Sequence, residues 1–286
     1  ADLFDCMDAL LRLHGPRKNQ PFGGVQMVMI GDLYQLPPVV TSGERQIFLE
    51  HYPSPYFFDA PSFSNLSVEL IELEKIYRQK DEDFIRILNG IRNRSISDAL
   101  FAQLNTRVQL EFEPEGKDAY VHLVTTNAKA EEINSRELAR IPGKKRSFDG
   151  LVRGEFNQKS LPAPLVLELK VGSQVMLTNN DREYRWVNGT VGVVRKIETT
   201  DEREIIWVTL ETGETVDVIP HRWDMFHFTY NQPSRRIDTE TIGSYTQYPL
   251  ILAWALTIHK SQGKTFEKVI VDMERGAFAH GQTYVA

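Results

Sequence analysis

The chain has 286 residues, with 33 Lys and Arg against 39 Asp and Glu, and a formal net charge of −6. This length accommodates one large domain or about two to three small ones. The acidic balance excludes a protein that coats DNA through bulk positive charge, although a cleft lined locally with Lys and Arg remains compatible with it. The single cysteine, Cys6, excludes an internal disulfide and a cysteine-rich zinc site.

The sequence shows neither a membrane-spanning run nor a secretory signal pattern. No apolar run approaches the roughly 20 residues that a membrane-spanning helix needs, so no membrane partner is predicted. No signal-peptide pattern opens the chain, and one cysteine is the usage expected of a reducing compartment.

The first part of the chain shows α/β periodicity. Residues 3–12 place apolar side chains on one helical face. Residues 25–30 form a nearly continuous apolar run that ends at Gly31-Asp32, which is typical of a parallel strand buried on both faces. A strand-like pattern follows at 68–73, and a helix is predicted over 84–91.

A second strand–helix unit follows. Residues 119–124 are apolar and are predicted to form a strand, the polar turn Thr125-Thr126-Asn127 comes next, and a helix is predicted over 128–140. Repeated strand–helix units indicate an α/β fold with parallel sheets.

From about residue 165 the pattern changes to short strands at close spacing, which favours a small β-barrel. The predicted strands are 175–178, 191–197, 205–210 and 216–219, with turn signals such as Asn188-Gly189 between some of them. The α/β pattern returns at residue 250 and gives a further buried strand at 269–272, so the barrel is predicted to be inserted in an α/β domain.

The strongest local motif is GDLYQLPP at 31–38. Polar groups at the carboxyl end of a parallel strand lie where α/β sheets bind ligands. Gln35 could donate to a phosphate oxygen or orient a water molecule, as glutamine does in nucleotide hydrolysis. The alternative is a plain turn after a strand, but the eight-residue string favours the functional interpretation.

Two further motifs carry donors suited to phosphates. Arg78, in Tyr77-Arg78-Gln79, could reach a γ-phosphate from a second lobe, although a surface arginine that caps a helix is the simpler alternative. In WALTIHKSQGKTF at 254–266, the polar cluster 259–262 favours phosphate binding. Trp254 could stack on a base, but a position in the core explains it at least equally well.

Two apparent sites are set aside. Gly263-Lys264-Thr265 looks like the end of a phosphate-binding loop, but the first glycine of that motif would fall at Ile258, so the motif is rejected. His221, Asp224 and His227 are better explained as ordinary surface residues than as metal ligands. No metal site is therefore predicted.

Taken together, these strings resemble superfamily 1B DNA helicases of the petite-integration-frequency and RecD-like branch. GDLYQLPPV at 31–39 is similar to that family's motif III, IYRQ at 76–79 to motif IV, LAWALTIHKSQGKTF at 252–266 to motif V, and GQTYVA at 281–286 to the start of motif VI. VTTNAKAEEIN at 124–134 resembles the second RecA-like lobe. VGSQVML at 171–177 and NGTVGVV at 188–194 resemble an inserted Src-homology-3-like barrel.

The resemblance implies an order of domains. Residues 1–73 would be the C-terminal part of a first RecA-like lobe, and 74–164 with 249–286 the second lobe. Residues 165–248 would be the inserted β-barrel, which would guide or clamp the strand. The implied fold is α/β, with RecA-like parallel-sheet lobes of the P-loop NTPase type.

The family also implies an activity, the ATP-driven unwinding of DNA with movement 5′→3′ along one strand, in processes such as DNA repair, recombination and telomere maintenance. The partners implied are single-stranded DNA and DNA junctions, and the protein is expected to be a monomer. Its location would be the cytoplasm or nucleoid in a bacterium, and the nucleus or mitochondrion in a eukaryote.

Residue roles follow by position. Gln35 would sense the γ-phosphate, Arg78 would act as an arginine finger, and Gly263 and Asp32 would lie at the nucleotide. The residues that would face DNA are Asn127, Thr257, His259 and Lys260.

The chain departs from the family pattern in two places. The Walker A loop and the Walker B pair, which hold ATP and Mg²⁺, should precede residue 1, and motif VI would continue past Ala286 to a second arginine finger. Since such groups supply most of phosphoryl-transfer catalysis, the isolated chain is expected to have little ATPase activity. Two alternatives remain, a module that binds single strands without ATP turnover and a scaffold whose barrel recruits a protein.

Overall fold

The computed structural model describes residues 1–286 apart from 41–42, 78, 115–119, 158–160, 201–203 and 232–235. The chain divides into two compact units, described below each by itself. The first unit comprises Ala1–Phe112 and Ala277–Ala286, and the second comprises Glu113–Gly276. No helix in the described ranges is both long and apolar enough to cross a membrane.

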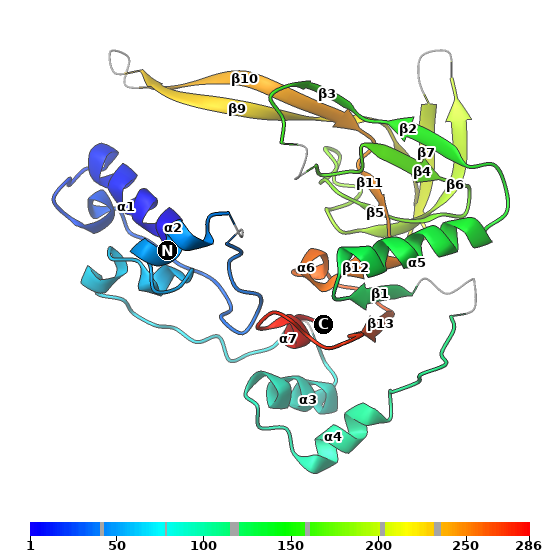
Figure 1. The fold of residues 1–286 in the computed structure, drawn as a ribbon, viewed down its shortest axis with the longest axis horizontal. Coiled ribbons are helices and arrows are strands. Elements are labelled where there is room, and N and C mark those ends of the chain that lie inside the picture. Colours follow the sequence, from blue (N-terminus) through cyan, green and yellow to red (C-terminus); the bar gives the residue numbers. More distant parts are fainter. Residues whose placement is uncertain (41–42, 78, 115–119, 158–160, 201–203, 232–235) are drawn as a thin grey trace. The chain divides into compact units, whose positions relative to one another are not determined.

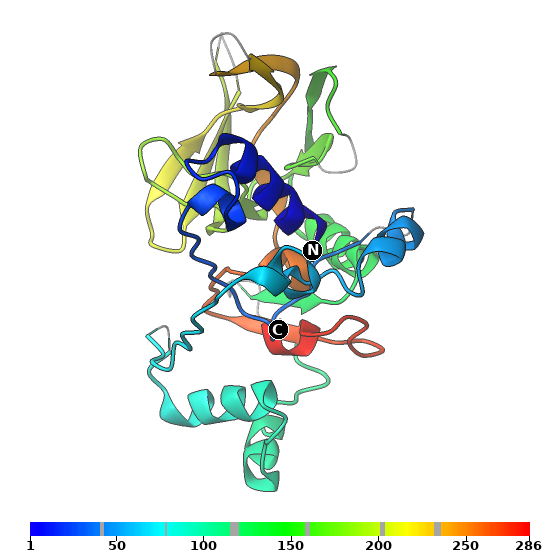
Figure 2. The same ribbon diagram turned by 90° about the vertical axis from the view of Figure 1, so that its left-hand side faces the viewer.

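The first unit is built from helices. Its α-helices are α1 (Asp2–His14), α2 (Arg45–His51), α3 (Glu82–Arg92), α4 (Asp98–Asn105) and α7 (Gln282–Val285), and its 3-10 turns are η1 (Pro21–Gly24), η2 (Phe57–Asp59) and η3 (Phe63–Asn65). α1 and α3 confirm the helices predicted over 3–12 and 84–91. Both α3 and α4 begin at a capping side chain, which satisfies an otherwise unpaired N–H of the first turn: Asp81 accepts from Phe84 N, and Ser97 from Leu100 N. Figures 1 and 2 show α3 and α4 as consecutive helices that run in different directions.

A small aromatic core joins α1 to η1. The ring of Phe4 packs edge-on against that of Phe22, with centroids 5.1 Å apart. Asp8 of α1 accepts a hydrogen bond from Phe22 N at 2.6 Å and pairs with Arg12 at 2.6 Å. The charged hydrogen bond holds η1 against the helix although Phe22 adopts a positive φ of 49°.

The buried strand predicted at 25–30 is not present in the structure. Within the described part of the first unit, neither 25–30 nor 68–73 pairs with another strand. Val28 is 76% exposed and Ile30 is 90% exposed, so the prediction that 25–30 is a buried strand is wrong for this chain. A strand is buried in a parallel sheet only when neighbouring strands satisfy its backbone groups and helices cover its faces.

The second unit contains a parallel sheet with the strand order β12-β1-β13. Its strands are β1 (Val121–Val124), β12 (Ala255–Thr257) and β13 (Val269–Asp272), of which β1 and β13 confirm predicted strands. Val124 is in register with Thr257 on one side and with Asp272 on the other. Helix α5 (Asn127–Arg140) confirms the predicted helix and packs on this sheet (Figure 1).

The second unit also contains helix α6 (Ile258–Ser261) and a set of antiparallel strands. They are β2 (Arg146–Asp149), β3 (Leu151–Gly154), β4 (Val166–Leu169), β5 (Gln174–Leu177), β6 (Val191–Thr199), β7 (Glu204–Leu210), β8 (Thr215–Val218), β9 (His221–Asn231), β10 (Arg236–Gln247) and β11 (Leu250–Leu252). β5 to β8 confirm the four predicted strands, and with β11 they form a five-stranded sheet ordered β11-β5-β6-β7-β8. Their inward side chains form the largest apolar core of the second unit.

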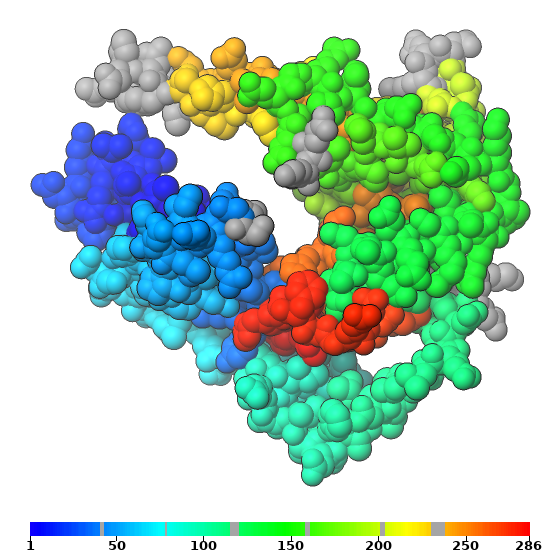
Figure 3. Space-filling view, in the orientation of Figure 1, coloured from blue at the N-terminus to red at the C-terminus, as the bar shows by residue number. Residues whose placement is uncertain are grey.

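Two smaller sheets complete this region. β2 pairs with β4, and β3-β10-β9 form a three-stranded sheet. Antiparallel strand pairing therefore begins at Arg146 and ends at Leu252, beyond the predicted barrel range of 165–248. The Src-homology-3-like form of the barrel stays a prediction. The β9–β10 ribbon extends from the body of the second unit as a long arm, drawn in yellow and orange (Figure 3).

Side chains of Gln174 and Lys170 join the antiparallel region to the parallel sheet and to α5. The side-chain amide of Gln174, on β5, donates to the carbonyl oxygens of Tyr120 and Ala253, both at 2.9 Å. The ammonium of Lys170 donates to Ile141 O at 2.8 Å, at the end of α5. These bonds satisfy backbone carbonyls that packing removes from water, so they fix the inserted strands on the sheet.

Candidate functional site

In the first unit, Asp32 organises a tight turn that holds Gln35. Its carboxylate accepts from Tyr34 N at 3.0 Å and from the Gln35 side-chain amide at 3.1 Å. Gln35 N also donates to Asp32 O at 3.3 Å. Aspartate favours such turns because its short side chain bonds the backbone two residues ahead. The structure thus brings together two of the four residues predicted to meet the nucleotide, Asp32 and Gln35.

The segment 281–284 contacts this Asp32–Gln35 turn. The Tyr284 hydroxyl donates to Asp32 Oδ2 at 3.3 Å, and the rings of Tyr34 and Tyr284 lie edge-on, 6.3 Å apart. Gly281 has a φ of 72°, and a Cβ there would overlap the carbonyl of Gln35. Burial, then the negative charge of Asp32, raises the pKa of the Tyr284 hydroxyl. The start of the motif VI string therefore packs on the motif III string.

Helix α3 contacts the same turn through Arg92. The guanidinium Cζ lies 4.6 Å from the centre of the Tyr34 ring, within the range of a cation–π contact. An Nη of Arg92 also lies 3.5 Å from Glu72. Arg92, Tyr34 and Tyr284 were not predicted as site residues. The two tyrosines stand inside recognised strings, whereas no local pattern distinguishes Arg92 from other surface arginines.

The remaining nucleotide predictions are less constrained. Arg78 lies outside the described residues. Gly263 follows α6 (Ile258–Ser261) in the second unit and has a φ of 75°, with no atom within 4 Å of an added Cβ. The Gln35 side-chain amide, held by the Asp32 carboxylate, is suited to contact a phosphate group. The sequence contains no glycine-rich loop that would bind the phosphates themselves.

In the second unit, the predicted DNA-binding residues share one edge of the parallel sheet. β12 ends at Thr257 and leads into His259 and Lys260 on α6, while β1 leads through Thr126 to Asn127 at the start of α5. Since β1 and β12 are parallel neighbours, both loops leave the sheet at its carboxyl edge, where α/β sheets bind ligands. The structure thus places all four predicted residues where two adjacent strands end and lead into helices.

The accessibility of these four side chains differs. Asn127 and Lys260 are exposed, and His259 is half-buried. Thr257 is buried, and its hydroxyl accepts from Lys260 N at 3.4 Å as the cap of α6. Thr257 therefore positions the start of α6, while Lys260 and Asn127 present polar groups to solvent.

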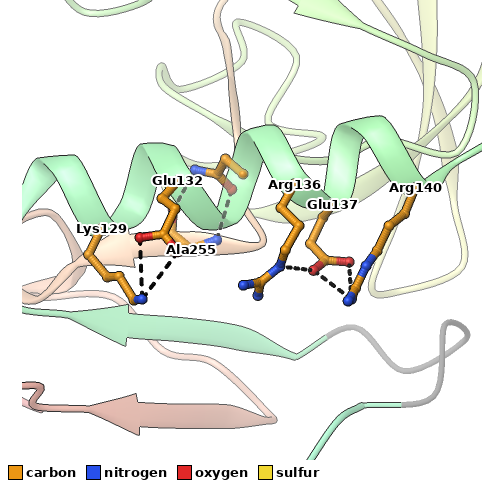
Figure 4. Close-up of polar contacts among 7 residues, drawn as sticks. Lys129, Glu132, Arg136, Glu137, Arg140 and Ala255 are labelled. Atoms are coloured by element: carbon orange, nitrogen blue, oxygen red, sulfur yellow. Dashed lines mark hydrogen bonds and ion pairs between the residues drawn. The ribbon is translucent and has the colours of Figure 1, made fainter.

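Asn134 holds the outer edge of β12, which no strand covers in the described sheet. Its side-chain amide donates to Ala255 O at 2.9 Å, and its carbonyl accepts from Ala255 N at 2.9 Å. Elsewhere on α5, charged pairs join Lys129 with Glu132, and Arg136 and Arg140 with Glu137 (Figure 4). Asn134 thereby completes the hydrogen bonding of a buried residue two positions before Thr257.

Lys264 joins the segment after α6 to the antiparallel region. Its ammonium donates to Asn188 Oδ1 at 3.0 Å, and its alkyl chain lies on Gly189, where an added Cβ would be 3.0 Å from Lys264 Cγ. Burial lowers the pKa of this ammonium. Lys264, Asn188 and Asn134 were all missed, because each acts through a partner distant in sequence.

Trp254 and the possible metal ligands are the last residues that the sequence singled out. Trp254 is half-buried and packs against the core that includes Val124 and Ile133, in line with the core alternative. Among the residues that the structure describes, no three His, Cys, Asp or Glu side chains come close enough together to hold a metal ion.

The sequence is similar to those of known PIF1-like helicases. Residues 1–99 match the model of the PIF1-like helicase family. The chain is 34% identical over 293 residues to the ATP-dependent DNA helicase PIF1 of Homo sapiens, an alignment that covers 100% of this chain and 42% of the human protein. It is 26% identical to the ATP-dependent DNA helicase Pif1 of Campylobacter jejuni, over 94% of this chain and 61% of that protein.

Solved structures show the same likeness. The crystal structure of Bacteroides Pif1 bound to single-stranded DNA superimposes with a TM-score of 0.72 and 37% identity, covering 100% of this chain and 64% of that one. The Bacteroides Pif1 complex with ADP-AlF4 gives a TM-score of 0.78 and 37% identity, covering 99% of this chain and 64% of that one.

The fold and the motif strings define a RecA-like α/β protein of the helicase class. Within that class, the chain is similar over its whole length to PIF1-like helicases, whose family model matches residues 1–99. It spans less than half the length of the human relative, 42%.

Proposed function

We propose that this chain is the C-terminal part of an ATP-dependent DNA helicase that moves 5′→3′ along single-stranded DNA. The observation that carries the proposal is similarity to Pif1 helicases over the whole chain, with the four motif strings in family order. The proposed substrates are single strands and DNA junctions, and the proposed working form is a monomer.

The nucleotide role proposed for the first unit rests on the Asp32–Gln35 turn. Gln35 senses the γ-phosphate of ATP, bound with Mg²⁺, and Asp32 sets the orientation of its amide through the 3.1 Å bond. Arg78 supplies a positive charge to the phosphate and Gly263 lies at the nucleotide. The isolated chain has little ATPase activity, because its sequence contains no glycine-rich loop ending in Gly-Lys-Ser or Gly-Lys-Thr.

The DNA role proposed for the second unit rests on the two loops at the carboxyl edge of the parallel sheet. Lys260 and His259 offer a charged and a polar donor to phosphates, and Asn127 offers an amide from the adjacent loop. Thr257 contributes by capping α6. Single-stranded DNA is bound by a Bacteroides Pif1 whose structure superimposes on this one, which supports the same ligand here.

Binding of a fluorescent oligothymidine to the 286-residue chain, followed by anisotropy, tests this DNA role. The wild-type chain should bind the single strand more tightly than a duplex of equal length. Lys260→Ala should weaken binding and reduce the slope of log affinity against log salt by about 0.7, the value for one phosphate contact on a single strand. Lys145→Ala is a matched control. Lys145 lies away from this edge, where its ammonium is paired with the Glu168 carboxylate at 2.7 Å. Equal effects of the two variants would refute the assignment.

A strand-binding module without ATP turnover is the second candidate. One observation favours it: all four predicted DNA-binding residues lie in one compact unit, whereas the chain contains only part of the expected nucleotide machinery. Phosphate release measured on the protein encoded by the complete reading frame separates the two. DNA-stimulated ATP hydrolysis supports the motor, and strand binding without hydrolysis supports the module.

A further inference from the structure

Tyr184 is an exposed aromatic residue with a strained backbone. Its side chain is 93% exposed, and its φ of 61° lies in the left-handed region that non-glycine residues adopt at a cost. Nothing about burial explains the tyrosine, since its ring covers almost no apolar surface. An aromatic ring kept in solvent at a strained position points to a role in binding.

The loop that carries Tyr184 is braced rather than loose. Asp181 accepts from Arg185 Nε at 2.7 Å and from the backbone N–H groups of Glu183 and Arg185, both at 3.2 Å. Arg185 also donates to Asp217 Oδ1 at 2.6 Å, on strand β8. These charge-assisted bonds fix the turn on both sides of Tyr184, so the ring leaves a rigid platform.

The same loop is tied to the predicted DNA-binding edge. Asn188, four residues after Tyr184, accepts the hydrogen bond of Lys264, which stands three residues after the end of α6. Asn188 N in turn donates to Asn180 Oδ1 at 2.8 Å, across the base of the loop. Four residues span at most about 14 Å, which limits the distance between Tyr184 and Asn188, and Lys260 stands four residues before Lys264 in the chain. One single strand is therefore long enough to contact both Tyr184 and Lys260.

We propose that Tyr184 stacks on a base of the single strand whose phosphates contact the α6 edge. This inference rests on the proposed function, because it assumes a strand at that edge, and it adds a base-stacking site on the inserted β-region. Single-strand-binding proteins combine such rings with cationic grooves, and the stacking tolerates any base because every base has a π-face. The Lys264–Asn188 bond holds the two parts of this surface in alignment.

The experiment is oligothymidine binding by the 286-residue chain, combined with thermal melting followed by tryptophan fluorescence. All four tryptophans, at positions 186, 207, 223 and 254, lie in the second unit, so this signal reports the unit that carries the loop. Tyr184→Gly removes the ring and relieves the positive φ, whereas Tyr184→Phe keeps the ring and removes only the hydroxyl.

Opposite effects on binding and stability are expected. Tyr184→Gly should weaken strand binding by about 5- to 140-fold, the range for loss of one stacked base, without changing the salt slope and with a melting temperature equal to or above that of the wild type. Tyr184→Phe should bind within about twofold of the wild type. Unchanged affinity in Tyr184→Gly, a fall in affinity together with a lower melting temperature, or equal weakening in Tyr184→Phe would each overturn the proposal. A wild-type chain that does not bind the oligonucleotide would instead refute the proposed function.

Discussion

Replacing Asn134 should destabilise the second unit by an amount that its contacts define. Asn134→Ala leaves both backbone groups of Ala255 without the partners that they have at 2.9 Å. Ala255 is 1% exposed, so water does not readily replace them. Each unsatisfied buried polar group costs about 1–3 kcal/mol, and together they should lower the free energy of unfolding by about 2–6 kcal/mol.

Urea denaturation followed by tryptophan fluorescence measures this loss in the second unit alone. Arg136→Ala is the matched control on the same helix, because Arg136 is exposed and its ion pair with Glu137 is of the kind worth under about 1 kcal/mol. A loss in Asn134→Ala no larger than that in the control would refute the idea that Asn134 completes the edge of β12.

Asn134→Asp adds a pH test of the same geometry. The introduced carboxyl must donate to Ala255 O, which only its protonated form can do, so its pKa should be higher in the folded than in the unfolded chain. The folded state then binds more protons, and stability relative to the wild type should fall as pH rises from about 4 through the folded pKa. A stability difference that is constant with pH would contradict the predicted donor role.

Three further predictions concern other contacts. Lys264→Met and Asn188→Ala should each lower the free energy of unfolding of the second unit by about 1 kcal/mol, and the double variant by less than the sum, since both remove one bond. Gly281→Ala should speed proteolytic cleavage within 277–286, whereas Gly31→Ala, which meets no atom within 4 Å, should not. Burial lowers the pKa of His122, so stability should fall as pH drops below about 6.5, and His122→Gln should flatten this dependence.

The elements best predicted from the sequence are those with a clear period. α1, α3, α5 and strands β5 to β8 follow from regular apolar spacing and turn residues. The long β9–β10 ribbon was missed, because polar and aromatic residues alternate there without a continuous apolar face. The burial of 25–30 was predicted wrongly, because periodicity shows that a segment is apolar but not whether a neighbouring strand is present.

The candidate site divides in the same way. Gln35, Lys260 and Asn127 stand in recognised strings or directly after a predicted strand, so local sequence indicated them. Arg92 and Asn134 act through contacts made across the fold, with Tyr34 and Ala255 respectively. Only the packing of distant segments makes such residues visible, which is why they carry no signal in a single sequence.

The most direct test of the account is strand separation by the protein encoded by the complete reading frame. A duplex with a 5′ single-stranded tail and one with a 3′ tail are each incubated with ATP and Mg²⁺, and release of the labelled strand is followed. The account predicts ATP-dependent unwinding of the 5′-tailed duplex that Gln35→Ala abolishes while single-strand binding persists. Unwinding of the 3′-tailed duplex alone, or full unwinding by Gln35→Ala, would contradict it.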